Sequence, residues 1–181
     1  MTIDIVGRSV PSVASSPSER VLEPDAAADH VTRLYRMARA LCGSADLAED
    51  LVQETYAAVF ARPRLLRGGD DFAYLARALR NTFFNHLRGR GGRPEPLVAD
   101  DLELADPRGD TDPHAALLAR ELYGTIAALP EDYREVIALV DVAGLSYKET
   151  ARALRIPTGT VMSRLHRARA RVVEALGDDW R

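Results

Sequence analysis

Residues 146–169 read SYKETARALRIPTGTVMSRLHRAR, and this stretch decides the fold. Ser146 with Glu149 fits a capping box, in which two side chains satisfy free backbone N–H groups at the start of a short helix. After Pro157, the pattern predicts a longer basic helix that runs to about Leu176. A short helix, a tight turn and a longer basic helix make up the helix-turn-helix pattern.

The second of these helices has two contrasting faces. At about 100° per residue, its apolar positions fall in one stripe that we expect to pack on the preceding helices: Val161, Leu165, Ala168 and Val172. The opposite face carries Gly159, Ser163, His166, Arg167 and Ala170, with Met162 at one edge and Arg164, Arg169 and Arg171 on the flanks. Small residues allow a helix to enter a DNA major groove, where Arg167 could bind guanine with two hydrogen bonds and the flanking arginines could bind phosphates. The alternative is an ordinary solvated arginine face.

A helix predicted from about Asp71 to Arg88 carries a different polar face. Its exposed positions combine aromatic, amide and guanidinium side chains: Tyr74, Arg77, Asn81, Phe84, Asn85 and Arg88. Such groups can stack on unpaired bases, hydrogen-bond to them and neutralise the backbone, which differs from the recognition of duplex DNA. The alternative for Tyr74 and Phe84 is packing against a neighbouring element.

A third helix, ending near Phe60, is mostly apolar and keeps only a thin polar strip, formed by Asp50, Gln53 and Glu54. Such a strip is either a solvated edge or a surface for a basic partner protein. Periodicity does not choose between the two.

The fold class predicted for the whole chain is all-α, with two small helical domains joined by an acidic flexible linker. Residues 1–28, which are rich in serine and proline, lack periodicity and are predicted to form a flexible tail. The two predicted helical domains cover residues 29–96 and 114–181. Between them, residues 97–113 carry one basic and six acidic side chains.

The formal net charge of -3 hides a strong alternation of charge along the 181 residues. The stretch from Tyr74 to Arg93 contains five arginines and no acid, and residues 157–171 contain four arginines and no acid. These are two separate basic stripes of the kind that bind nucleic acids. Among the 24 basic residues only Lys148 is a lysine, which suits phosphate and base contacts, although genome composition explains the same bias equally well.

Composition also excludes several classes of function. Cys42 is the only cysteine, so an internal disulfide and a multi-cysteine metal site are excluded, and we interpret Cys42 as a small core residue. The four histidines are scattered, so we expect neither a metal nor a cofactor. No apolar run is long enough to span a bilayer and the first residues do not form a signal peptide, so we expect a cytoplasmic protein with no membrane insertion.

Four stretches together resemble the extracytoplasmic-function (ECF) sigma factors of the sigma-70 family, the promoter-recognition subunits of bacterial RNA polymerase. They are DLAEDLVQETY at residues 46–56, FAYLARALRN at 72–81, LPEDYREVI at 129–137, and GLSYKETA through PTGTVMSRLHRAR at 144–169. The sequences DLVQETY and NTFFN are similar to the branch regulated by redox-responsive, zinc-containing anti-sigma proteins.

The resemblance implies a role for each polar surface. The strip formed by Asp50, Gln53 and Glu54 would bind the polymerase clamp helices. The minus-ten promoter element would be melted and one base captured by Leu66, Arg67, Tyr74, Arg77, Asn81, Asn85 and Arg88. The minus-thirty-five element would be read by Met162, Ser163, His166 and Arg167, with Arg164 and Arg169 beside them. The acidic linker would enter the channel that nucleic acid occupies in the polymerase.

The same resemblance implies the partners of the chain. They are RNA polymerase core, through its clamp helices and flap, promoter DNA in duplex and single-stranded form, and an anti-sigma factor. Two positions depart from the family pattern, because tryptophan is usual where this chain has Tyr74 and aspartate where it has Asn85. These departures bear on the minus-ten contacts.

Two other classes of function compete with this interpretation. A conventional helix-turn-helix regulator would bind duplex operator DNA alone, but it leaves the exposed face of the Asp71 to Arg88 helix unexplained. An enzyme is disfavoured because the chain contains no GxSxG motif, no Walker loop and no close set of His, Cys and Asp residues, so no catalytic residue is predicted.

Overall fold

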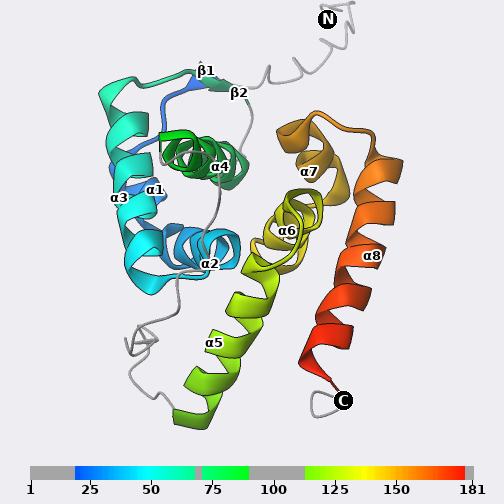
Figure 1. Ribbon diagram of the computed structural model, residues 1–181. Helices are drawn as coiled ribbons and strands as arrows, with labels where there is room; N and C mark the ends of the chain where they lie inside the picture. Colours follow the sequence, from blue (N-terminus) through cyan, green and yellow to red (C-terminus); the bar gives the residue numbers. More distant parts are fainter. Residues whose placement is uncertain (1–18, 68–70, 90–112, 178–181) are drawn as a thin grey trace, which may run out of the picture.

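The computed structural model describes residues 19–67, 71–89 and 113–177, which form the helical protein shown in Figure 1. Its first part contains β1 (Glu19–Arg20), α1 (Pro24–Ala28), α2 (Val31–Cys42), α3 (Ala45–Ala61), β2 (Leu66–Arg67) and α4 (Asp71–Gly89). Its second part contains α5 (Pro113–Ala127), α6 (Glu131–Ile137), the π-helical turn η1 (Ala138–Val142), α7 (Tyr147–Leu154) and α8 (Thr158–Leu176). The all-α prediction is confirmed. The predicted acidic linker lies outside the described residues except for Pro113.

Local sequence signals set several of these boundaries. Ser44 caps α3 by accepting a hydrogen bond from the Leu47 amide, and Gly43 ends α2 in the left-handed conformation, at φ 76°. The capping box at the start of α7 is present, because Ser146 accepts from the Glu149 amide while the Glu149 carboxylate accepts from the Ser146 amide. Capping residues of this type typically contribute about 1 kcal/mol each.

The prediction of a flexible tail over residues 1–28 is wrong for its last ten residues. Glu19 and Arg20 pair with β2, and α1 follows with Ala27 fully buried. Leu22 between them is 4% exposed. The sequence did not predict these two elements because a two-residue strand and a one-turn helix are too short to give a periodic signal. The serine and proline content of the segment favoured a flexible tail instead. Residues 1–18 lie outside the described part of the chain.

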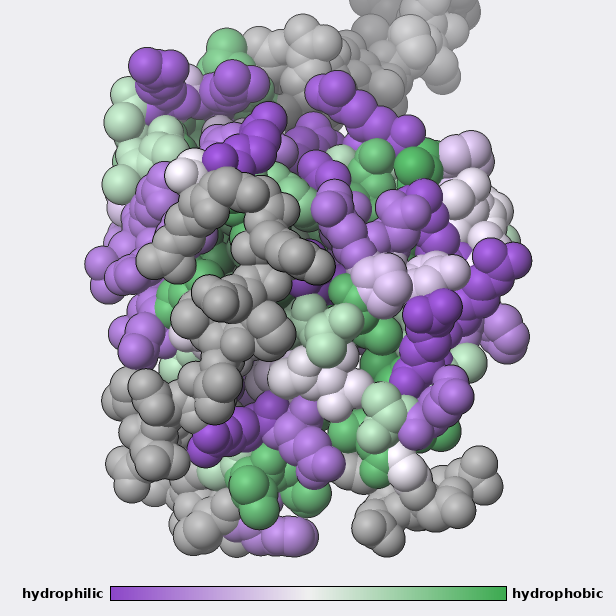
Figure 2. All heavy atoms as spheres, in the orientation of Figure 1, coloured by the Kyte–Doolittle hydropathy of each residue, from purple (hydrophilic) through white to green (hydrophobic). Residues whose placement is uncertain are grey.

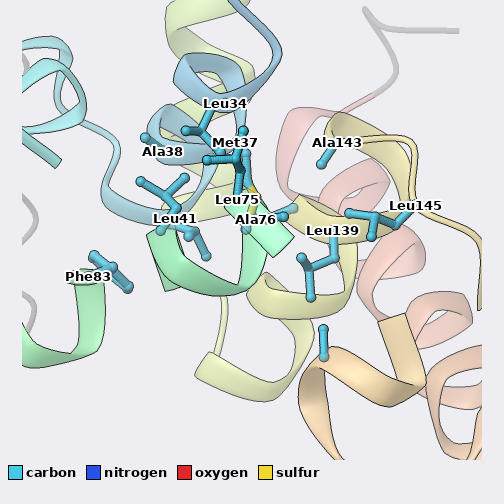
Figure 3. Close-up of a cluster of buried hydrophobic side chains, with 14 of the residues drawn as sticks. Leu34, Met37, Ala38, Leu41, Leu75, Ala76, Phe83, Leu139, Ala143 and Leu145 are labelled. Atoms are coloured by element: carbon cyan, nitrogen blue, oxygen red, sulfur yellow. The ribbon is translucent and has the colours of Figure 1, made fainter. Parts of the chain in front are cut away.

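The two helical parts share one apolar core. Figure 3 shows Leu34, Met37, Ala38 and Leu41 of α2 next to Leu75 and Ala76 of α4, with side chains of the second part, Leu139, Ala143 and Leu145, on the adjoining side. Eight of these nine residues are at most 1% exposed, and the ninth, Leu145, is 5% exposed. The sequence predicted two domains, and the structure packs them directly against each other.

Gly43 shows how close this packing is. A Cβ atom at Gly43 would lie 3.0 Å from Cβ of Ala127, at the end of α5 in the second part. No larger side chain fits there without movement of α5. Glycine at this position therefore serves both the left-handed end of α2 and the approach of the second part.

Polar contacts complete the interface between the two parts. Arg80 Nε of α4 lies 2.5 Å from Glu135 Oε1 of α6, and Glu135 is 4% exposed. Burial raises the pKa of Glu135, and the hydrogen bond from Arg80 only partly offsets that effect. Arg33 of α2 donates to the backbone carbonyl of Ala143 at 2.5 Å. The separation of the two parts would therefore disrupt a buried ion pair as well as apolar contacts.

Candidate nucleic-acid interface

The buried stripe of α8 is the one predicted from the sequence. Val161, Leu165 and Ala168 are at most 2% exposed, and Val172 is half-buried against the core. The opposite face is open to solvent: Met162 is 49% exposed, and Ser163, His166 and Arg167 are also exposed. Hydrophilic side chains cover much of the face over α8 in Figure 2. Four of the predicted minus-thirty-five residues thus lie together on one surface.

The arginines of α8 fall into two groups. Within the described residues, Arg167 forms no ion pair or side-chain hydrogen bond, so its five donors are available to a ligand. Arg169 instead donates to both oxygens of Asp141, over 2.9 Å and 2.6 Å. Arg164 NH2 lies 2.7 Å from Asp132 Oδ2. Two arginines predicted to flank the DNA site therefore connect α8 to α6 and η1.

The sequence did not predict the contacts of Asp132 and Asp141 with the arginines of α8. The two aspartates precede their arginines by about thirty residues and belong to different helices, so no short spacing relates them. Arg171 is held similarly, with its guanidinium carbon 4.9 Å from the centre of the Tyr133 ring. The hydrogen bonds that Arg169 donates to Asp141 raise the pKa of the Arg169 guanidinium group. A DNA phosphate that binds Arg164 or Arg169 therefore competes with a neighbouring carboxylate for part of the guanidinium group.

The exposed face of α4 is also as predicted for its polar members. Arg77, Asn81, Asn85 and Arg88 are exposed along one side of the helix. Arg88 donates to the Asn85 side-chain oxygen over 2.5 Å. These four residues form a surface of amides and guanidinium groups that is suited to unpaired bases and phosphates.

The aromatic residues of α4 behave differently from its amides. Tyr74 and Phe84 are half-buried and pack against the core, which is the alternative that the sequence left open. Phe84 contacts Phe83 edge to face, with ring centres 5.2 Å apart, and Arg80 lies 4.8 Å above its ring. Only part of each ring is therefore available to a base. Leu66, half-buried, and Arg67 stand before the helix in β2.

The polar strip of α3 lies on a separate surface. Asp50, Gln53 and Glu54 are exposed, while Leu51, Val52 and Thr55 on the inner side are buried. In Figure 1, α3 and α8 stand at opposite sides of the molecule, with α4 and α6 between them. The strip and the arginine face of α8 are therefore two separate surfaces.

The described residues contain no cluster of His, Cys, Asp and Glu suited to a metal ion. No helix within the described ranges is long and apolar enough to cross a membrane. Cys42 is half-buried against the core, and burial raises the pKa of its thiol to about 11. Its Sγ donates to the Ser44 carbonyl at 3.2 Å, as expected for a core residue.

An all-α chain with a helix-turn-helix, a second helix rich in exposed amides and arginines, and an acidic strip is the arrangement of a DNA-binding transcription factor. Family models identify it further. The model of sigma-70 region 2 matches residues 27–93, and that of sigma-70 region 4 matches residues 119–172. The chain belongs to the sigma-70 family, within its ECF sigma factors, which direct promoter-specific initiation of transcription.

Several relatives support this assignment. The ECF RNA polymerase sigma factor SigE of Mycolicibacterium smegmatis is 35% identical over 81% of this chain and 58% of its own length. The RNA polymerase sigma-H factor of Pseudomonas aeruginosa is 36% identical over 71% of this chain and 72% of its length. EcfG of Rhodopseudomonas palustris is 34% identical over 78% of each chain.

Two solved structures share the fold. RpoE of Bartonella quintana, in complex with the anti-sigma factor NepR, has a TM-score of 0.65 and 28% identity over 87% of this chain and 99% of its own. CnrH in complex with the cytosolic domain of CnrY has a TM-score of 0.54 and 25% identity over 84% of this chain and 85% of its own.

Proposed function

We propose that the three exposed polar surfaces divide the work of promoter recognition. Asp50, Gln53 and Glu54 of α3 bind the polymerase clamp helices. The exposed face of α4, with Leu66 and Arg67 before it, opens the minus-ten element, and the exposed face of α8 reads the minus-thirty-five element. The observation that carries this proposal is that each surface lies on the solvent side of a helix whose other side is buried in one core.

Arg167 has the central role on α8. Its guanidinium group is planar, exposed and free of internal partners within the described residues, so it can bind guanine O6 and N7 together. Met162, Ser163 and His166 surround it on the same face. Arg164 and Arg169 bind phosphates beside the groove, in competition with Asp132 and Asp141.

On α4, Asn81 is the residue we assign to base capture. It stands in the middle of the exposed side, four residues from Arg77 and four from Asn85, so all three side chains share one face. Asparagine can hydrogen-bond to the Watson–Crick edge of an extruded base, and the arginines hold the strand by its phosphates. Tyr74, which is half-buried on the same helix, contributes the exposed part of its ring to stacking.

This function requires the two helical parts to separate. The names of the two promoter elements place them about 25 base pairs apart, which is about 85 Å along B-form DNA. A compact chain of 181 residues has a radius of gyration of about 16 Å, so the closed arrangement cannot reach both elements. Residues 90–112, if fully extended, span up to about 80 Å, which is close to the required distance. Opening breaks the Arg80–Glu135 contact.

We further propose that the chain is not an enzyme and acts in the cytoplasm, where the polymerase forms the bonds of the transcript. An anti-sigma factor is a proposed third partner, because the chain resembles two sigma factors solved with anti-sigma proteins. A helix-turn-helix regulator remains the competing function. It differs in needing no polymerase to find its site.

Run-off transcription with purified core polymerase on genomic fragments tests the proposal. A discrete transcript that depends on the chain supports it. The Asn81→Ala variant should keep core binding but form fewer open complexes, while Arg36→Ala, a change at an exposed arginine on α2, should change neither. Duplex binding by the chain alone, without any transcript, would favour the regulator.

A further inference from the structure

Arg20 makes two contacts that lie on either side of the entry to α4. Its backbone pairs with Leu66 in the antiparallel β1–β2 ladder, where Glu19 pairs with Arg67. Its side chain reaches the first residue of α4, with NH2 2.6 Å from Asp71 Oδ2. Arg20 therefore contacts both the strand that ends at Arg67 and the helix that begins at Asp71.

The Asp71 end of this contact is buried. The Asp71 side chain is 9% exposed, and its second oxygen, Oδ1, is buried without a hydrogen-bond partner in the described residues. The Arg20 side chain is 40% exposed, so one partner of the ion pair is accessible to solvent and the other is almost buried. Removing Arg20 leaves a buried carboxylate whose remaining favourable interaction is with the N-terminal end of α4.

Arg20 is itself held in place by the segment that follows it. Leu22 is 4% exposed in the core, and the Tyr56 hydroxyl of α3 donates to the Ala27 carbonyl at the end of α1, over 2.8 Å. The segment from Arg20 to Ala27 is therefore fixed to the first helical part at both ends. A fixed anchor can transmit a defined position to the entry of α4, whereas a flexible tail cannot.

We propose that Arg20 is a positioning residue for minus-ten recognition. Through its backbone pairing with Leu66 and its ion pair with Asp71, Arg20 fixes the positions of β2 and of the first turn of α4. It thereby also fixes the position of the exposed side chains of α4 that begin at Tyr74. Arg20 itself does not contact DNA. This inference rests on the proposed role of α4 and of Leu66 and Arg67 in opening the promoter.

The experiment compares full-length variants in holoenzyme with purified core polymerase. Open complexes are measured by permanganate reactivity of unpaired thymines, on a promoter with its native minus-ten element and on copies with single base changes there. Arg20→Ala should reduce the ratio between native and altered promoters about tenfold, because a misplacement of about 1 Å in positioned groups can cost up to about a hundredfold. Affinity for core and for minus-thirty-five duplex should stay unchanged.

Two further variants separate positioning from stability. Asp71→Asn removes the ion pair without leaving a buried charge, and it should relax minus-ten discrimination as Arg20→Ala does. Arg20→Lys keeps the charge and the strand pairing, and it should restore part of the discrimination. Arg36→Ala is the matched control, an exposed arginine of the same helical part, and it should behave as the unmodified chain.

The outcomes distinguish this inference from the function on which it rests. If Arg20→Ala and Asp71→Asn lower the melting temperature but leave minus-ten discrimination intact, while Asn81→Ala impairs open complexes, the positioning role is overturned and the role of α4 stands. If Asn81→Ala also has no effect, the role of α4 in promoter opening fails. If Arg20→Ala and Asp71→Asn both relax minus-ten discrimination while the affinity for core polymerase is unchanged, the inference is supported.

Discussion

Replacing Arg167 with alanine should relax recognition of the minus-thirty-five element without affecting the fold. Arg167 is exposed and has no internal partner within the described residues, so its truncation should change the free energy of unfolding by less than about 0.5 kcal/mol. A lost bidentate contact to guanine costs about 1–3 kcal/mol of discrimination. This corresponds to about a 5- to 150-fold smaller ratio between the native element and one with that guanine replaced.

Arg169→Ala is the matched control, because it removes an arginine from the same helix only two residues away. Arg169 already donates to both oxygens of Asp141 from Nε and NH2, so fewer of its N–H groups are available to a phosphate. We expect Arg169→Ala to weaken all sequences equally and by less. Asp141→Asn should free Arg169 and raise affinity for every duplex, with a steeper dependence on salt.

Fluorescence anisotropy with labelled duplexes in holoenzyme, at several salt concentrations, measures both quantities. The argument predicts that Arg167→Ala changes the ratio between sequences, whereas Arg169→Ala and Asp141→Asn change the overall affinity. An Arg167→Ala variant with unchanged discrimination would refute the assignment of base reading to this face. Equal effects of both arginine substitutions on discrimination would refute the distinction drawn from the Asp141 contact.

Three other predictions concern other parts of the molecule. Asn81→Ala should lower the yield of open complexes at unchanged affinity for core, and equal permanganate reactivity would count against it. Glu135→Arg places a second positive charge against Arg80, and breaking a buried ion pair at one partner costs about 3–5 kcal/mol. This change should open the two parts and speed amide exchange across α2 and α4. Glu131→Arg, at an exposed site, should leave exchange unchanged. Because burial raises the pKa of Cys42 to about 11, its thiol should stay protonated and resist alkylation at pH 8 until the chain unfolds, and rapid labelling of the folded protein would contradict this.

The helix-turn-helix and its faces were predictable because the information is local. A capping box spans four residues, and the buried stripe of α8 repeats every three or four positions, so Ser146, Glu149, Val161 and Leu165 suffice to place them. The exposed amides and arginines of α4 follow from the same periodicity. These are features that a short window of sequence contains in full.

The remaining features depend on contacts between distant residues. Nothing near Arg169 indicates that Asp141 occupies its donors, and nothing near Asp71 indicates that Arg20 will reach it from 51 residues away. The packing of the two helical parts was also not predicted, because an acidic segment between them favoured independent domains. Close packing against Gly43 is a property of the folded chain, and it is visible only once Ala127 is placed.

The most direct test of the central claim is transcription by purified core polymerase on a promoter found by mapping transcripts that depend on this chain. We predict a discrete product that requires the chain, starts at one position, and is lost when either the minus-ten or the minus-thirty-five element is replaced. No product from any genomic fragment, with sequence-specific duplex binding by the chain alone, would contradict the claim that it acts as a sigma factor.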